Sequence, residues 1–485
     1  MVPLAADFRH RLTTGKQVSK QKKRYRNDVR LSHSRTVDDG FVKLWEKVAH
    51  VVRDTAAEYD GKWMIRKRLI DTLFLIVFIF RLVSSKNMQG YGATLDEMWD
   101  SSKALDLPLP QKSSVTPSSV CEARTKLKEE VFRSINQRII EAYEDKADPK
   151  QQWLGHRLFA VDGSKINLPR SLFASGYTSP SDHASYPQGL LSCLYQLQSK
   201  IPYDFDLTAH TNERIAAEPH LKVLKKGDVV VYDRGYFSYF MLHQHQERGV
   251  HAIFRLQNSG YKVIQNFFIS ESMDTIVTLD PSDDRRRELR KDHPELKIVP
   301  LTMRLIKYVI NGSTFCLGTT LLDAHYPQAS FEDVYHSRWG IEELYKISKH
   351  TFRIEEFHAK TERGVRQEIF AHFALITMNR IFANHADGEL NTNLSPPRLD
   401  DKNAPHTFQT NFKACAHVFT RSMEALLFLH DKVRASIANV YNCIVGRYQA
   451  VRRGRSYERR SMKPVNKWRA KNKTKNVGVP VSVPS

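Results

Sequence analysis

Cysteine is scarce in this chain, and its few cysteines are scattered. The sequence contains no CxxC pair among its five cysteines, which are Cys121, Cys193, Cys316, Cys415 and Cys443. This spacing argues against a zinc ribbon and provides no disulfide framework. We therefore expect reduced thiols without a ligand role. His243 and His245 lie close together, but no cysteine or acidic partner completes a metal set nearby, so we expect both histidines at the surface.

Long hydrophobic runs are also missing. The most apolar run, residues 73–80 (LFLIVFIF), is too short to span a bilayer. The first residues, MVPLAADFRHRL, lack the apolar segment of a signal peptide. We expect residues 73–80 to form a buried helix, no membrane among the partners, and a location inside the cell.

Acidic residues are outnumbered by basic ones. The chain has 74 Lys and Arg against 53 Asp and Glu, a formal net charge of +21 and a pI near 9.6. Such a balance attracts polyanions, which makes nucleic acid the first expected partner. Ribosomal and membrane-surface proteins share this trait, so charge alone leaves those classes open.

Composition and periodicity divide the chain into regions. Residues 1–38 form a basic arm, since residues 9–35 hold ten Lys or Arg and one acid. Residues 39–150 are expected to be a helical DNA-binding domain, in which Thr116 caps a helix of a weak helix-turn-helix pattern. Residues 381–485 are expected to be helical with a basic tail. Both basic ends are either phosphate anchors or solubilising tails.

Residues 151–380 change to the period of strands. Their order is strand, hairpin, helix, strand, helix, strand, with the hairpin turn at Ser199-Lys200. The first strand ends at Asp162 and a later one at Asp233, each followed closely by glycine. Each aspartate alone is typical of a turn.

An insertion interrupts this order at about residues 261–325. We expect it to be β-rich, with residues 262–269 (KVIQNFFI) as one strand and residues 283–291 as a charged loop.

The most informative segment is YHSRWGIEELYKISKH, residues 335–350. At about 100° per helical residue, one narrow stripe of this helix carries a phenol, a carboxylate and three cations: Tyr335, Arg338, Glu342, Lys346 and Lys349. Such a stripe suits a surface that holds a metal and grips phosphates. The alternative is a solvated helix with stabilising ion pairs, although Trp339 and Ile341 favour a helix packed at its start.

Four of these residues fill the pattern Y-x2-R-x3-E-x6-K, which resembles the signature of the IS4-type insertion-sequence transposases, a group that includes the Tn5 transposase. VDGS at residues 161–164 and YDRGYFSYF at residues 232–240 resemble the family's first and second catalytic boxes. The resemblance covers roughly residues 155–380. It implies an α/β protein with an RNase H-like mixed-sheet catalytic core and a β-rich insertion, flanked by helical N-terminal and C-terminal regions.

The resemblance also implies the site. Asp162, Asp233 and Glu342 would be the catalytic metal ligands for Mg²⁺, for which Mn²⁺ can substitute; carboxylate oxygens suit such hard ions, and two ions can serve phosphodiester chemistry. DNA would be gripped by the other members of the stripe, Tyr335, Arg338, Lys346 and Lys349.

The implied function is cut-and-paste DNA transposition, a DDE-type phosphodiester hydrolysis and transesterification. The partners would be double-stranded DNA at the element's terminal inverted repeats and at the target, held by a homodimer on paired ends. The implied location is the cytoplasm of a bacterial or archaeal cell, at the nucleoid. The alternatives are a metal-dependent nuclease without strand transfer and a non-catalytic transposase-derived DNA-binding protein.

One departure concerns hairpin formation at the DNA end. Tn5-like enzymes stack a flipped base on a tryptophan in the insertion, but no tryptophan lies between Trp153 and Trp339 here. Stacking needs only an aromatic face, so Tyr308, Phe315 and Tyr326 are the candidates to replace it.

Overall fold

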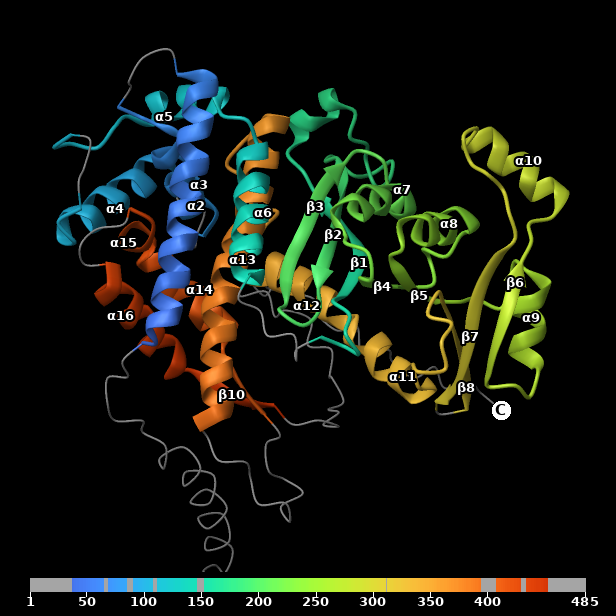
Figure 1. Cartoon of the computed structure of the whole chain (residues 1–485). Coiled ribbons are helices and arrows are strands. Elements are labelled where there is room, and N and C mark those ends of the chain that lie inside the picture. The colour runs from blue at the N-terminus through green and yellow to red at the C-terminus, as the bar shows by residue number, and fades with distance from the viewer. Residues whose placement is uncertain are drawn as a thin grey trace, which may run out of the picture.

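A mixed sheet with helices packed on both faces organises the computed structural model (Figure 1). The structure describes residues 37–64, 69–84, 90–107, 111–145, 152–310, 312–393, 407–428 and 433–451. Most of the predicted basic arm and basic tail therefore lies outside the described residues. No helix among the described residues is long and apolar enough to cross a membrane.

The sheet has eight strands in the order β3-β2-β1-β4-β5-β8-β7-β6. Their bounds are β1 (Leu158–Asn167), β2 (Gln188–Gln196), β3 (Ile201–Thr208), β4 (Val229–Tyr232), β5 (His251–Arg255), β6 (Asp274–Leu279), β7 (Leu301–Ile310) and β8 (Ser313–Thr319). β1, β2 and β3 are antiparallel neighbours, whereas β1, β4 and β5 run parallel. This is the strand order of an RNase H-like core, so the predicted fold class is confirmed.

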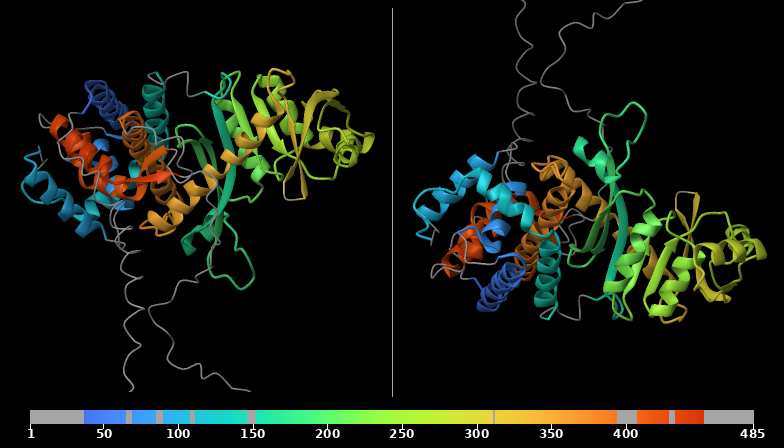
Figure 2. Two further views of the ribbon diagram at one scale, coloured as in Figure 1. Left: turned by 90° about the horizontal axis from the view of Figure 1, so that it is seen from below. Right: turned by 90° about the horizontal axis from the view of Figure 1, so that it is seen from above.

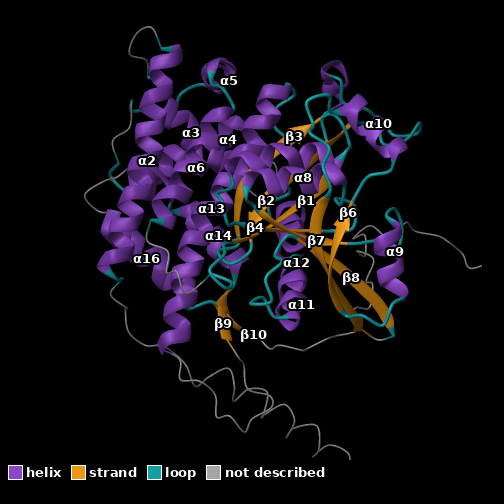
Figure 3. Cartoon of the chain, turned by 45° about the vertical axis from the view of Figure 1, so that its right-hand side comes forward, coloured by secondary structure: helices purple, strands orange, loops and turns teal. Residues whose placement is uncertain are grey.

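Two sets of helices cover the two faces of this core (Figure 3). They are α7 (Glu213–Ala217), η3 (Glu218–Val223) and α8 (Tyr239–Arg248) on one face, and α11 (Gln328–Ser337), α12 (Trp339–Lys346) and α13 (Glu362–Asn393) on the other. Tyr232 packs with Met241 of α8, while Ala160 shares a core with Leu344 of α12. β4 is buried throughout, as expected of a parallel strand covered on both faces.

The N-terminal and C-terminal helices form one layer around α13 (Figure 1). The layer contains α2 (Asp39–Trp63), α3 (Thr72–Ser84), α4 (Tyr91–Ala104), α5 (Pro117–Lys126), α6 (Glu130–Glu144), α14 (Phe412–Arg421), α15 (Met423–Leu427) and α16 (Val433–Val445). Beside it, β9 (Thr407–Thr410) pairs with β10 (Tyr448–Val451). Figure 2 shows this layer at one end of the molecule and β6, β7 and β8 at the other.

Several local predictions for these helices are confirmed. Residues 73–80 lie in α3, where the side chains from Phe74 to Phe80 are at most 6% exposed. Thr116 caps α5 by accepting a hydrogen bond from the Ser119 amide at 3.3 Å.

Two predictions for the insertion were wrong. Residues 262–269 form the helix α9 (Lys262–Ile269), which buries Ile264 and Phe267 while Ile269 is 81% exposed. A short apolar run fits a strand or a helix equally well. Here the two buried residues are three positions apart, which is the spacing of one face of a helix. The expected charged loop is the helix α10 (Asp283–Asp292), which Ser282 caps.

The prediction that His243 and His245 lie at the surface was also wrong. Both are buried, but on different sides of α8: His245 contacts Tyr232 of β4, whereas His243 lies beside Tyr239. Nε2 of His245 lies 2.9 Å from the Tyr232 hydroxyl, and burial lowers the pKa of His245 to about 4. This histidine is therefore a neutral core residue.

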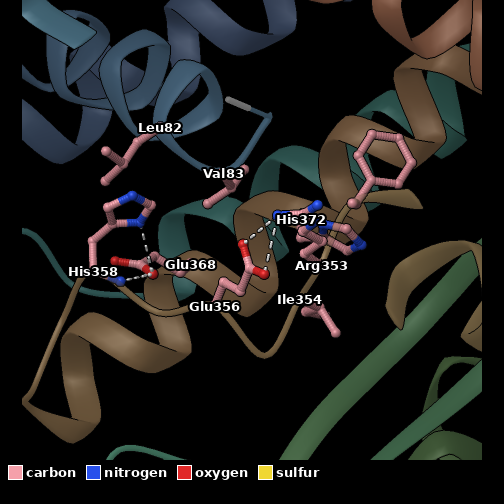
Figure 4. A pocket seen from close by; sticks show the side chains of 9 residues that line it. Leu82, Val83, Arg353, Ile354, Glu356, His358, Glu368 and His372 are labelled. Atoms are coloured by element: carbon pink, nitrogen blue, oxygen red, sulfur yellow. Dashed lines mark hydrogen bonds and ion pairs between the residues drawn. The ribbon is translucent and has the colours of Figure 1, made fainter. Parts of the chain in front are cut away.

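A buried ion pair ties α5 to the start of α13. The Arg124 guanidinium lies 2.8 Å from Glu368 and donates to the Gly364 carbonyl at 2.7 Å. Figure 4 shows Glu368 beside His358, whose backbone amide donates to it at 3.0 Å. The adjoining cavity of about 20 Å³ has room for one water molecule, not for a nucleotide.

Candidate active site

The two candidate aspartates lie at equivalent positions of neighbouring strands. β1 and β4 are parallel, and Ala160 is the partner of Val231. Asp162 and Asp233 each follow two residues later, so both lie at the same level of the sheet and on the same face. The prediction that the first strand ends at Asp162 was wrong, because β1 continues to Asn167 and pairs Asp162 with Cys193 of β2. Neighbouring strands are about 4.8 Å apart, which brings the two carboxylates together although 70 residues separate them in the sequence.

That face is the one covered by α11 and α12. The Tyr335 hydroxyl of α11 donates a hydrogen bond to Oδ1 of Asp233 at 3.1 Å. The Tyr345 hydroxyl of α12 donates to the Asp162 carbonyl at 2.8 Å and lies 3.0 Å from the Leu191 carbonyl. These hydrogen bonds fasten the signature segment across β1 at Asp162 and across the end of β4.

The signature segment is not one continuous helix, contrary to the single stripe predicted. α11 ends at Ser337, where the Arg338 amide donates to the Tyr335 carbonyl at 3.2 Å, and α12 begins at Trp339. A π-helical turn follows at Ile347–Thr351.

Arg338 lies among the carboxylates and is only 5% exposed. Its Nη2 atom donates to Oε1 of Glu342 at 2.9 Å. Burial alone would lower the pKa of Arg338, but Tyr335 and the acidic groups of the site raise it on balance. In this structure Arg338 therefore neutralises the carboxylates. Its partner Glu342 lies nearer the surface, with a side chain that is 41% exposed.

The other predicted DNA-binding residues lie further out. Lys346 forms an exposed ion pair with Glu343 at 2.7 Å. Lys349 donates to the Lys165 carbonyl at 2.6 Å. Trp339, expected to be packed, is 56% exposed, and its ring lies tilted against that of His336 at 4.9 Å.

Two further residues at the site escaped the sequence analysis. Glu213 of α7 approaches Gly163 so closely that a Cβ there would lie 3.1 Å from the Glu213 Cγ. Tyr236 is 1% exposed, and its hydroxyl has no hydrogen-bond partner in the described part of the chain. Burial raises the pKa of Tyr236, and the charges of Asp162 and Glu213 raise it further. Tyr236 was detectable as the third residue after Asp233, whereas only the fold places Glu213.

The donor chemistry of the site fits a hard divalent ion, since β1, the loop after β4 and α12 each supply one carboxylate. The side chains do not yet form a closed set: among the described residues, no three acidic, histidine or cysteine side chains are grouped closely enough to hold a metal ion. Glu342 is instead ion-paired with Arg338.

Burial raises the pKa of Asp162 to about 6, and the charges of Glu213 and Glu342 add to the effect. Because the folded pKa lies above the unfolded value of about 3.9, ionised Asp162 destabilises the fold, and the cost grows as the pH rises from about 4 to 6. In EDTA at pH 8, Asp162→Asn should therefore increase the free energy of unfolding by about 1–3 kcal/mol.

Thermal melts at several pH values check this prediction. The advantage of Asp162→Asn should shrink as the pH falls towards 4, and Mg²⁺ at pH 8 should stabilise the wild type more than the variant. Equal melting temperatures from pH 5 to 8 would contradict it.

A hollow of about 400 Å³ adjoins the site beyond Asp233. Its wall includes Arg234, Arg255 and Phe315, and the Arg255 guanidinium lies over the Phe315 ring at 4.9 Å. The other two stacking candidates are engaged elsewhere. Tyr308 donates to the Gln328 carbonyl, and the Tyr326 hydroxyl lies 2.9 Å from Nε2 of His156.

Residues 153–378 match the family described as the transposase DDE domain. The match spans slightly less than half of the chain and includes all three candidate carboxylates. This segment is similar to the DDE domain of transposases, and the match supports a transposase. It does not distinguish the IS4 type from other groups.

The comparison with solved structures includes the cryo-EM structure of a piggyBac transposase synaptic complex with hairpin DNA. That similarity has 10% sequence identity and a TM-score of 0.38, and it covers 85% of this chain and 87% of that chain. Identity and TM-score this low add nothing to the assignment of function. No curated protein matches the chain significantly.

Proposed function

We propose that this protein is the DNA transposase of an insertion sequence of the IS4 type. It binds terminal inverted repeats, cleaves DNA in a metal-dependent reaction and joins the freed end to target DNA. The observation that carries the proposal is the register of β1 and β4, which puts Asp162 and Asp233 side by side beneath the helix that supplies Glu342. The family match over the same residues supports it.

Asp162, Asp233 and Glu342 would hold Mg²⁺, or Mn²⁺ in its place. Divalent ions supply an activated oxygen nucleophile and a stabilised leaving oxygen. Tyr335 orients the Asp233 carboxylate through its hydrogen bond. Arg338 balances the negative charge of the carboxylates in this structure and would supply a bidentate partner for a DNA phosphate.

DNA binding is assigned to cationic and polar side chains on several elements. Tyr335, Arg338, Lys346 and Lys349 would contact the cleaved strand, while the helices of residues 39–150 would bind the terminal repeat together with the basic ends of the chain. Each chain has one carboxylate set, whereas an element has two ends to be cut. This favours a homodimer on paired ends, with one subunit cutting each end.

Lys346→Ala should remove one phosphate contact. The lysine is exposed and its ion pair with Glu343 is worth little in water, so it is available to DNA. Titrations of duplex DNA across salt concentrations should show a salt slope smaller by about one unit. Lys222→Ala, at an exposed position of η3 on the opposite face, is the matched control. An unchanged slope for Lys346→Ala would indicate that Lys346 only forms an ion pair on a solvated helix surface and does not contact DNA.

Phe315 is the proposed stacking residue for hairpin formation, because it lines the hollow beside Asp233. Phe315→Ala should reduce the hairpin product by at least about fivefold, since base–aromatic stacking is worth about 1–3 kcal/mol. Phe315→Trp should retain it. Denaturing gels of end-labelled DNA detect the hairpin as a double-length strand. Equal loss in Tyr308→Phe would contradict the choice of Phe315.

Reconstituted transposition tests the proposed function. Terminal inverted repeats flanking the gene would be cloned around a marker and incubated with the protein, Mg²⁺ and target plasmid. Excision followed by joining to the target is expected. Cleavage without joining would indicate the nuclease, and repeat binding without cleavage would indicate the non-catalytic DNA-binding protein.

A further inference from the structure

A second, larger pocket continues away from the candidate active site. Its volume is about 930 Å³, and it lies between the loop after β4, the start of α8 and the insertion. It shares Arg234, Gln257 and Ser259 with the hollow that contains Phe315. Because Arg234 directly follows Asp233, the two cavities adjoin each other next to the candidate catalytic aspartate.

Positive charge dominates the lining of this pocket. Four cations line it, Arg214, Arg234, Lys262 and Arg285, against a single acid, Asp280. Asp280 is already ion-paired with Arg286. Arg234 and Lys262 are exposed and form no ion pair or hydrogen bond with the rest of the described chain. Arg285 forms a surface ion pair with Glu288, and Arg214 donates to the Gly235 carbonyl. The uncompensated charge that the pocket presents to an anionic ligand therefore comes from Arg234 and Lys262.

Three helices begin at the wall of this pocket. The N-cap residues of α8, α9 and α10 all line it: Ser238, Tyr261 and Ser282. Each helix start adds a partial positive charge and free amide groups. α9 has no side-chain cap. The Tyr261 hydroxyl is buried without a hydrogen-bond partner among the described residues, so this wall retains an unused polar group.

Aromatic faces accompany the cations. Phe237 and Tyr261 line the pocket and are only partly buried. A groove that combines basic side chains with aromatic faces is the usual design for binding a single nucleic-acid strand, because phosphates meet the cations and bases stack on the rings. A pocket of this volume accepts a small ligand, which corresponds to a few nucleotides of one strand and excludes a duplex.

We propose that this pocket binds a short unpaired stretch of the DNA strand that passes Asp233. This inference rests on the proposed function of the neighbouring site. It assigns the insertion a role in holding the strand beyond the scissile phosphate, through Lys262 and Arg285 at its far wall. Duplex DNA would be bound elsewhere, by the helices of residues 39–150 and by Arg338, Lys346 and Lys349.

Binding of a single strand in the absence of metal tests the proposal. The full chain is titrated against fluorescein-labelled dT12 and against a 12-base-pair duplex in EDTA, with anisotropy as the readout. Lys262→Ala/Arg285→Ala should weaken dT12 binding about tenfold and reduce its salt slope by about 1.4 units, for two contacts at about 0.7 each. Duplex binding should stay within about twofold of the wild type.

The matched control is Arg287→Ala/Arg290→Ala. Both residues are exposed on α10 outside the pocket, and their removal changes the net charge equally. This control should bind dT12 like the wild type. Unchanged dT12 binding by Lys262→Ala/Arg285→Ala, or an equal loss in the control, would overturn the proposal.

A crosslink locates the strand independently. Oligonucleotides carrying 5-iododeoxyuridine should crosslink to Phe237 or Tyr261 on irradiation, and peptides mapped only outside the pocket would contradict the assignment. Failure of this inference is distinguishable from failure of the proposed function. Asp162→Asn should lose cleavage but keep dT12 binding, so loss of either property without the other identifies which assignment is wrong.

Discussion

Alanine at Asp162, Asp233 or Glu342 is expected to abolish DNA cleavage and leave DNA binding almost intact. Each residue would contribute carboxylate oxygens to metal ions that stabilise the transition state by several kcal/mol, so cleavage should fall by about 10³-fold or more. Binding rests on cations spread over other elements and should change by less than about twofold. Cleavage of labelled end DNA in Mg²⁺ and in Mn²⁺, with mobility shifts in parallel, measures both quantities.

Glu343→Ala is the matched control for the glutamate. Glu343 is the next residue of α12, but its side chain is 59% exposed and pairs with Lys346 on the outer surface. The control should cleave at nearly the wild-type rate. Near-normal cleavage by Asp162→Ala, Asp233→Ala or Glu342→Ala would contradict the assignment of that carboxylate.

Arg124→Ala is expected to cause the largest loss of stability. The arginine is 4% exposed and donates to Gln367 and to the Gly364 carbonyl in addition to its ion pair with Glu368. Removing it leaves the Glu368 carboxylate, which is also 4% exposed, buried without its counter-charge. Breaking a buried pair in this way costs about 3–5 kcal/mol, measurable by denaturant unfolding at pH 7.

Lys126→Ala provides the comparison on the same helix. Lys126 pairs with Glu122 at 2.6 Å, but this pair lies at the surface and is worth about 0.3–0.5 kcal/mol. The prediction fails if Arg124→Ala and Lys126→Ala lower the free energy of unfolding equally. Because α5 and α13 share the buried pair, local unfolding of Arg124→Ala should begin where the helical layer meets α13.

The catalytic core was predictable because its signals are local. Asp233 follows a buried strand, Asp162 directly precedes Gly163 within β1, and the alternation of polar and apolar residues indicates where the strands lie along the chain. The apolar run at residues 262–269 was misjudged because a short run carries no decisive period. The charged segment at residues 283–291 was misjudged because ion pairs such as Arg287–Asp284 stabilise a helix that buries little.

The details of the site depend on contacts between distant segments, which no spacing reveals. Arg338 was expected to be available to phosphate, but tertiary packing buries it and pairs it with Glu342. Glu213 reaches the site only because α7 follows the β2–β3 hairpin and folds back towards Gly163. Tyr345 shows no motif of its own, yet its hydroxyl joins α12 to β1 and β2.

The central claim is that the carboxylate of Asp233 is a ligand of the catalytic metal, and a change of metal preference tests it most directly. In Asp233→Cys, a soft sulfur replaces a hard oxygen, and softer ligands disfavour Mg²⁺. Cleavage of end-labelled DNA is measured in Mg²⁺ and in Mn²⁺. If Asp233 is a metal ligand, Asp233→Cys should not cleave DNA in Mg²⁺ and should recover substantial cleavage in Mn²⁺, while Asp233→Ala should stay inactive in both. Cleavage by Asp233→Cys in Mg²⁺ at the wild-type rate would contradict it.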